Sequence, residues 1–160
     1  MLLNKLKDKI LFFLDGWFFH YGIAKQLHQK YDCEIAAIVD VEDKTKQFFK
    51  NQSMVPFKNT WYLTDNVSIK NEYDSKFLEE IEKKYNIDLW KIAYSDREFR
   101  KFNKFHKFTD DEILSILEQE CRFFSNILDK FKPNFLATFI PITHHNFLLH
   151  QMCKNSGVIP

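Results

Sequence analysis

Residues 9–14 read KILFFL and are followed by Asp15 and Gly16, and residues 33–41 read CEIAAIVDV. A continuous apolar run of this kind, closed by an acid, is typical of a strand buried on both faces of a parallel sheet. Between the two runs, residues 21–31 place apolar side chains on one helical face and lysines and glutamines on the other. Strand, helix and strand within about 30 residues predict a βαβ unit and hence an α/β fold.

The rest of the chain continues this alternation. Thr109 and Glu112 have the spacing of a capping box, which predicts the start of a long helix. Pro133 predicts the end of that helix. Residues 87–107 have no single period and are expected to be irregular. Further strands are expected at 60–63 and 135–140, and further helices at 43–50, 74–85, 109–132 and 145–157. The expected fold is a Rossmann-like three-layer domain with a mainly parallel sheet of at least four strands.

The length of 160 residues is that of one domain with a real core. Residues 1–160 are therefore interpreted as a single Rossmann-like domain. The alternation calls for another strand at Val158, Ile159 and Pro160, where the sequence ends. We therefore expect the domain to be truncated before its last strands and to be the N-terminal part of a longer two-domain protein.

The net charge of +1 supplies no field that would attract nucleic acid. The run REFRKFNKFHKF (residues 97–108) alternates basic and aromatic side chains, a pattern that can bind nucleic acid by stacking and phosphate contact. Because the chain has no supporting net charge, we interpret this run as an amphipathic segment packed on the domain. No nucleic-acid partner is expected. The same aromatic side chains could dock a lipid-linked or sugar acceptor near a membrane surface.

The three cysteines are odd in number and far apart, which favours free thiols in a reducing compartment. They have no zinc-motif spacing, and no metal site is expected. The first apolar run is too short for a signal peptide or a membrane span. The predicted location is the cytoplasm, and peripheral association with the inner face of the membrane stays open.

Three polar segments follow predicted strands: Asp15–Gly16–Trp17, Asp40, and Thr143–His144–His145. Ligands of open α/β sheets bind beyond the carboxyl ends of the strands, so these segments are candidates for one binding edge. His20 lies next to the first of them. The first loop, DGWFFHYG, has neither the GxGxxG pattern nor a GK[ST] ending, so a standard dinucleotide or P-loop site is not expected.

Each candidate also has a structural interpretation. Thr143 can be the N-cap of the last helix, and the two histidines its first residues. In the functional interpretation an imidazole instead faces a sugar hydroxyl or a phosphate, beside free backbone N–H groups. Asp40 has the position of a ribose-binding acid, and also that of an ordinary solvated acid at the end of a strand.

A family resemblance rests on SDREFRKFNKFHKFTDDEILSILEQECRFF (95–124), KPNFLATF (132–139), the His144–His145 pair, Cys153 and Gly157. With these motifs the chain resembles the N-terminal half of capsule and surface polysaccharide biosynthesis proteins, which look like two-Rossmann glycosyltransferases of the GT-B type. The general plan covers nearly the whole chain, and the specific pattern covers residues 90–157.

This resemblance implies an acceptor-side domain for a sugar or a lipid-linked glycan. The nucleotide-sugar donor would bind to the C-terminal half, so no cofactor is expected in this half. The isolated domain is expected to be inactive. The candidate bases that would take a proton from an acceptor hydroxyl are Asp15, His20 and His144. The candidate substrate-binding residues are Gly16, Trp17, Asp40, Thr143, His145 and Arg97.

Two other functions remain open. One is a non-catalytic Rossmann- or flavodoxin-like module that binds a nucleotide or a protein. The other is one half of a sugar-nucleotide epimerase-like protein. The continuation of the gene past Pro160 separates them: a second βαβ domain with a glycine-rich loop favours an enzyme, and a stop codon favours the binding module. The sequence does not reveal the oligomeric state.

Overall fold

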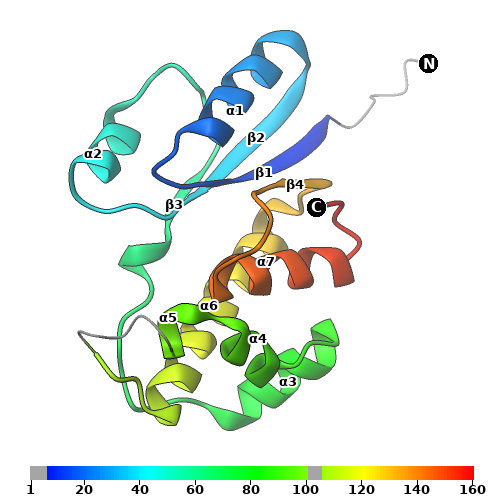
Figure 1. The fold of residues 1–160 in the computed structure, drawn as a ribbon. Coiled ribbons are helices and arrows are strands. Elements are labelled where there is room, and N and C mark those ends of the chain that lie inside the picture. Colours follow the sequence, from blue (N-terminus) through cyan, green and yellow to red (C-terminus); the bar gives the residue numbers. More distant parts are fainter. Residues whose placement is uncertain (1–6, 101–105) are drawn as a thin grey trace.

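The computed structural model describes residues 7–100 and 106–160 of the chain (Figure 1). These described residues form four strands, a single turn of 3-10 helix at Leu63–Asp65, and seven α-helices. The strands are β1 (Asp8–Leu14), β2 (Cys33–Val39), β3 (Thr60–Tyr62) and β4 (Phe135–Ala137). The helices are α1 (Phe19–Lys30), α2 (Asp43–Asn51), α3 (Ser75–Tyr85), α4 (Leu89–Ser95), α5 (Arg97–Arg100), α6 (Asp110–Phe131) and α7 (His144–Asn155).

The strands form one sheet in the order β3-β2-β1-β4, and every neighbouring pair is parallel. Phe135 of β4 also forms a parallel bridge with Ile159, where the sequence predicted the start of another strand. The α/β class and the Rossmann-like parallel sheet are therefore confirmed. The strand order reverses direction at the boundary between β1 and β4, which defines a topological switch point.

Alternate residues of the central strands point to opposite faces of the sheet, as the pleat requires. Leu11 and Phe13 of β1 belong to the core on the side of α3, α4, α6 and α7. Phe12 and Leu14 belong to the core on the side of α1 and α2. The sheet is thus the middle of three layers (Figure 1), and both faces of β1 are buried, as its apolar run predicted.

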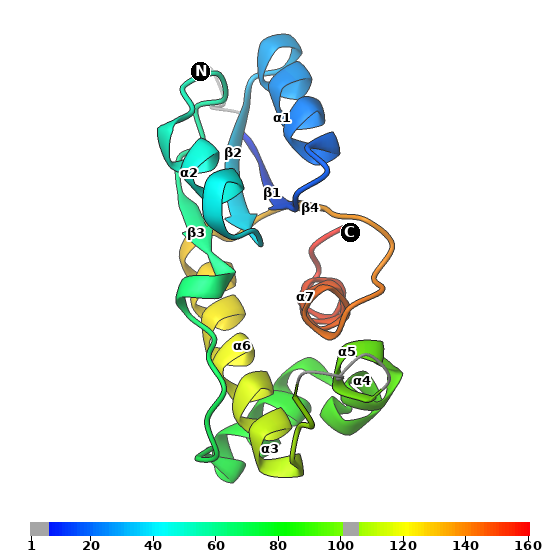
Figure 2. The ribbon, with the colours of Figure 1, turned by 60° about the vertical axis from the view of Figure 1, so that its left-hand side comes forward.

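Helix α6 runs from the sheet to the helical part of the molecule beyond it (Figure 2). Its N-terminus has the predicted capping box: the Thr109 hydroxyl accepts the Glu112 N–H at 3.2 Å, and the Glu112 carboxylate accepts the Thr109 N–H at 2.8 Å. Its 22 residues make a rod of about 33 Å. One end lies by the sheet, α3 packs beside the other end, and α4 lies next to α5 and α7 (Figure 2).

Two predicted elements differ in the structure. Residues 87–107 were expected to be irregular, but they contain α4, whose N-cap Asp88 accepts the Lys91 N–H at 2.8 Å. Residues 101–105 of this segment lie outside the described residues. The strand predicted over 135–140 ends at Ala137, because only three of its residues pair with β1. The apolar side chains that follow are left at the edge of the sheet.

Among the described residues, no helix is both long enough and apolar enough to cross a membrane.

Candidate functional site

The β1–α1 loop and the segment from Thr138 to Thr143 lie at the switch point, where the carboxyl ends of β1 and β4 meet. In the first loop, Asp15 Oδ1 accepts the Trp17 N–H at 3.0 Å. Trp17 is 84% exposed, and a side chain added at Gly16 would find open space. The predicted substrate-binding residues of this loop therefore face solvent.

His20 lies behind this loop in the first turn of α1. Its ring is buried and packs edge-on against Phe139, with the ring centroids 4.1 Å apart. Burial lowers the pKa of His20 below its ordinary value, although the nearby Asp15 carboxylate opposes this shift. Within the described part of the chain, its buried Nδ1 atom has no hydrogen-bond partner. The two loops of the switch point are thus joined through His20 and Phe139.

Large apolar side chains are exposed along the same edge. Phe19 and Phe139 contact each other with ring centroids 5.8 Å apart, and Ile140 and Ile142 are 83% and 80% exposed. We call this surface the apolar rim; it consists of Trp17, Phe19, Phe139, Ile140 and Ile142. Phe19 and Phe139 join the two segments that carry these side chains, and exposed apolar side chains that lie together mark interaction sites.

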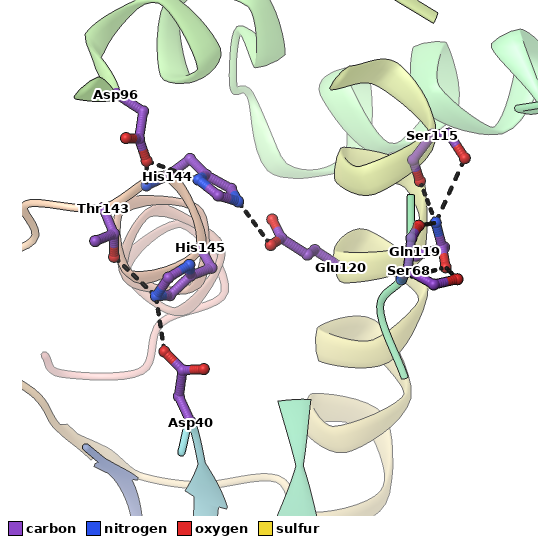
Figure 3. Close-up of polar contacts among 9 residues, drawn as sticks. All are labelled: Asp40, Ser68, Asp96, Ser115, Gln119, Glu120, Thr143, His144 and His145. Carbon is purple, nitrogen blue, oxygen red and sulfur yellow. Dashed lines mark hydrogen bonds and ion pairs between the residues drawn. The ribbon is translucent and has the colours of Figure 1, made fainter. Parts of the chain in front are cut away.

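A second group of side chains lies between the sheet and the helices α4, α6 and α7 (Figure 3). Two imidazoles from the first turn of α7 face three carboxylates from different elements. Asp40 follows β2, Asp96 follows α4, and Glu120 projects from α6. We call this group the histidine–carboxylate cluster; it consists of Asp40, Asp96, Glu120, His144 and His145.

His144 is held between two carboxylates. Its Nδ1 atom lies 2.6 Å from Asp96 Oδ2, and its Nε2 atom lies 2.9 Å from Glu120 Oε1. Its ring also packs on Phe99, with the centroids 4.3 Å apart. Burial opposes the charged imidazolium, but the carboxylates of Glu120 and Asp96 outweigh it and raise the pKa of His144 to about 10. His144 is therefore an imidazolium at neutral pH.

His145 lies beside His144, with the two ring centroids 5.0 Å apart, on the side of the helix start that faces the sheet. Its Nε2 atom lies 3.1 Å from Asp40 Oδ2 and 2.8 Å from the Thr143 hydroxyl. Its ring is stacked on Phe13 of β1, with the centroids 5.8 Å apart. Asp40, predicted as a ribose-binding or a solvated acid, is thus a partner of His145.

The structure corrects two expectations at this helix start. An imidazole was expected to be exposed, but His144 is buried and only 12% of the His145 side chain is exposed. The carboxylates make this burial tolerable because they pair with the rings. Thr143 does occupy the N-cap position, but its hydroxyl contacts His145, and the carboxylate of Asp96 accepts the His144 backbone N–H.

A pocket of about 490 Å³ opens beside the cluster. Asp96 and Thr143 belong to its wall, so the pocket reaches the residues that contact the two imidazoles. The exposed Arg97, a predicted substrate-binding residue, lies on the same wall. The full lining is Ser95, Asp96, Arg97, Pro141, Ile142, Thr143 and Phe147.

Asp96 and Glu120 were not identified as site residues from the sequence. A signal for Glu120 was nevertheless present, because it lies on the same helical face as Leu117 and Phe124, both completely buried. A charged residue within an apolar stripe requires a buried partner. For Asp96, whose partners come from distant parts of the sequence, the local pattern held no comparable signal.

The cluster also has the composition of a metal site. One ligand atom from each of Glu120, His144 and His145 lies within 4.8 Å of the others. We expected no metal site because the cysteines lack zinc-motif spacing. That criterion does not apply to ligands that the packing of α6 against α7 brings together.

Neither a protein-family model nor a curated protein sequence matches this chain.

Proposed function

We propose that this chain is the acceptor-side domain of a GT-B-like glycosyltransferase in surface or capsular polysaccharide biosynthesis. The observation that carries the proposal is the apolar rim at the switch point between β1 and β4. Ligands of open α/β sheets bind at this place in the fold. The family resemblance around residues 90–157 supports the same function.

The chemistry of the rim suits an amphipathic acceptor. Trp17 and Phe139 offer aromatic faces, and Ile140 and Ile142 offer aliphatic surface. Aromatic side chains contribute large contact areas, and ligand sites combine such surfaces with a few polar groups that set orientation. A lipid-linked glycan has both an apolar chain and polar sugar hydroxyls, so it would use the rim and the Asp15 carboxylate together.

Of the three candidate bases, Asp15 and His20 fit the proton transfer better than His144. A general base must be unprotonated at the working pH. His144 has a pKa of about 10 and already holds its proton between two carboxylates. His20 has a lowered pKa and lies near Asp15, at the edge where the acceptor hydroxyl would lie. His20 would reach that hydroxyl after Phe139 moves off its ring.

The binding preference of this chain tests the proposal. Titration calorimetry would compare a polyprenyl-linked disaccharide in detergent micelles, empty micelles, and a free nucleotide-sugar. We expect heat of binding with the lipid-linked sugar above that of the empty micelles, and no micromolar binding of the nucleotide-sugar, because the chain has no glycine-rich phosphate loop. Micromolar binding of the nucleotide-sugar would refute an acceptor-side role.

The fluorescence of Trp17 reports where the acceptor binds. Its indole is mostly exposed, whereas Trp61 and Trp90 are half-buried, so a change in emission on acceptor binding should come mainly from Trp17. A Trp17→Phe variant should lose most of that change and keep its fold. If this variant gives the same emission change as the unmodified protein, the acceptor does not lie over the rim.

A further inference from the structure

We propose that Glu120, His144 and His145 bind one divalent transition-metal ion, and that Asp96 and Asp40 orient the two imidazoles. This inference goes beyond the acceptor role proposed above, and its test requires no acceptor. It rests on the ligand set, on the contacts of each imidazole, on one unpaired carboxylate oxygen and on the charge of the cluster.

The ligand set is two imidazoles and one carboxylate whose ligand atoms already lie within 4.8 Å of one another. Two histidines and a glutamate form one of the protein ligand sets of catalytic zinc sites, which leave a further position for water or substrate. Imidazole nitrogens select ions such as zinc, iron or nickel over magnesium and calcium, which prefer oxygen ligands. Zinc is the appropriate first probe.

Each imidazole already has the second partner that metal-bound histidines require. Such histidines usually hold their other ring nitrogen on a carboxylate, which sets the ring orientation and the tautomer. Asp96 occupies Nδ1 of His144 at 2.6 Å, which leaves Nε2 directed toward Glu120. Asp40 occupies Nε2 of His145 at 3.1 Å, which leaves Nδ1 as the ligand atom. Figure 3 shows the two rings between these carboxylates.

Glu120 supplies an independent observation. Only 2% of its side chain is exposed, and Oε1 contacts His144. Its Oε2 atom, also buried, has no hydrogen-bond partner among the described residues. Leaving a charged oxygen buried and unpaired is costly, so such an atom calls for an explanation. A cation bound by this carboxylate would remove the cost.

The charge of the cluster points in the same direction. With its three carboxylates ionised, the cluster is negative whether neither, one or both imidazoles carry a proton. A divalent cation offsets this charge. Coordination through Nε2 of His144 and the Glu120 carboxylate would replace their direct contact of 2.9 Å by two metal–ligand bonds. The pocket bounded by Asp96 and Thr143 opens beside the cluster, at residues that contact the two imidazoles.

The competing interpretation is a buried ion-pair network in which His144 simply joins α6 to α7. Such networks are common, and one is compatible with the contacts of His144. It does not require His145 to take part, however, and it leaves Oε2 of Glu120 unexplained. The role of His145 therefore separates the two interpretations.

Zinc titration of the chelator-treated chain at pH 8 tests the proposal. Calorimetry should show one zinc ion per chain, and the melting temperature should rise with zinc. His145→Ala should weaken the affinity at least about 100-fold, and Asp40→Asn about 10- to 100-fold, as outer carboxylates of metal sites do. Neither substitution breaks the contacts between His144 and its carboxylates. If His145→Ala does not fold, Asp40→Asn provides the decisive comparison.

His28→Ala is the matched control, because His28 is exposed on α1 and is not part of the cluster. It should bind zinc as the unmodified chain does. The proposal is overturned if the unmodified chain binds no zinc under these conditions. It is also overturned if His145→Ala, or Asp40→Asn in its place, keeps the affinity of the unmodified chain, or if His28→Ala loses as much affinity as His145→Ala.

Discussion

Glu120 Oε1 and His144 Nε2 lie 2.9 Å apart, in a contact that joins the middle of α6 to the first residue of α7. Both side chains are almost completely buried. The contact holds the last helix of the chain against the longest one, and with Asp96 it also ties in the end of α4. A small polar group therefore adds to the buried apolar side chains of α7 in holding this helix over the sheet.

Glu120→Gln should destabilise the metal-free chain by about 3–5 kcal/mol, because it removes one partner of a buried pair and leaves the imidazolium of His144 poorly compensated. Chemical denaturation in the presence of a chelator measures this change. Glu118→Gln, on the same helix, removes the charge of an acid that is 13% exposed, pairs with the exposed Arg122 and accepts the Asp74 N–H, which a glutamine oxygen can still accept. This control should cost at most about 1 kcal/mol. Equal effects of the two substitutions would contradict the importance of the buried pair.

The stability of the chain should fall as the pH decreases below 6.5, because of His20. Burial lowers the pKa of His20 in the folded chain below its ordinary value of 6.5. The unfolded chain then binds the proton more readily. The stabilising contribution of neutral His20 is fully present above pH 6.5 and is lost as the pH falls through the lowered pKa.

Denaturation curves between pH 5 and 8 measure this dependence, and His20→Asn should flatten it. His28→Asn, a change at an exposed position, should keep the slope of the unmodified chain. An NMR titration of the His20 ring with a midpoint at or above 6.5 would contradict the prediction.

Replacing exposed residues of the apolar rim should leave the fold intact and weaken the binding of amphipathic ligands. Trp17, Ile140 and Ile142 are each at least 80% exposed. Their replacement by serine should therefore change the free energy of unfolding by less than about 0.5 kcal/mol per site. Binding to detergent micelles that carry a lipid-linked sugar should decrease in the triple variant. A serine substitution of the exposed Met54, which is not part of the rim, should leave that binding unchanged.

At most one of the three thiols should react in the folded chain. Cys121 and Cys153 are completely buried. Burial raises the pKa of Cys153 to about 12 and that of Cys121 well above its ordinary range. Cys33 is half-buried at the start of β2, where a reagent can reach it. An aromatic disulfide reagent should modify no more than one thiol before denaturant is added, and none in Cys33→Ser. Rapid modification of two thiols in the native chain would show that the core opens readily.

The sequence by itself determined the α/β class and most element positions. The runs KILFFL and CEIAAIV became β1 and β2, and the capping box began α6 as predicted. These signals are local: a buried strand needs a continuous apolar run, and a helix needs an apolar stripe and a cap. The edge positions of Asp15, Asp40 and Thr143 followed once the strands were parallel.

Only the tertiary structure decided which of these residues meet. Glu120 is 24 residues from His144, and Asp96 is 48 residues from it. Their contacts depend on how α4, α6 and α7 pack, and no local period encodes that packing. The surroundings of each imidazole then set the direction of its pKa shift. Two carboxylates raise the pKa of His144, whereas burial lowers the pKa of His20. Sequence position placed both histidines at the edge of the sheet, and packing alone raised the pKa of His144 and lowered that of His20.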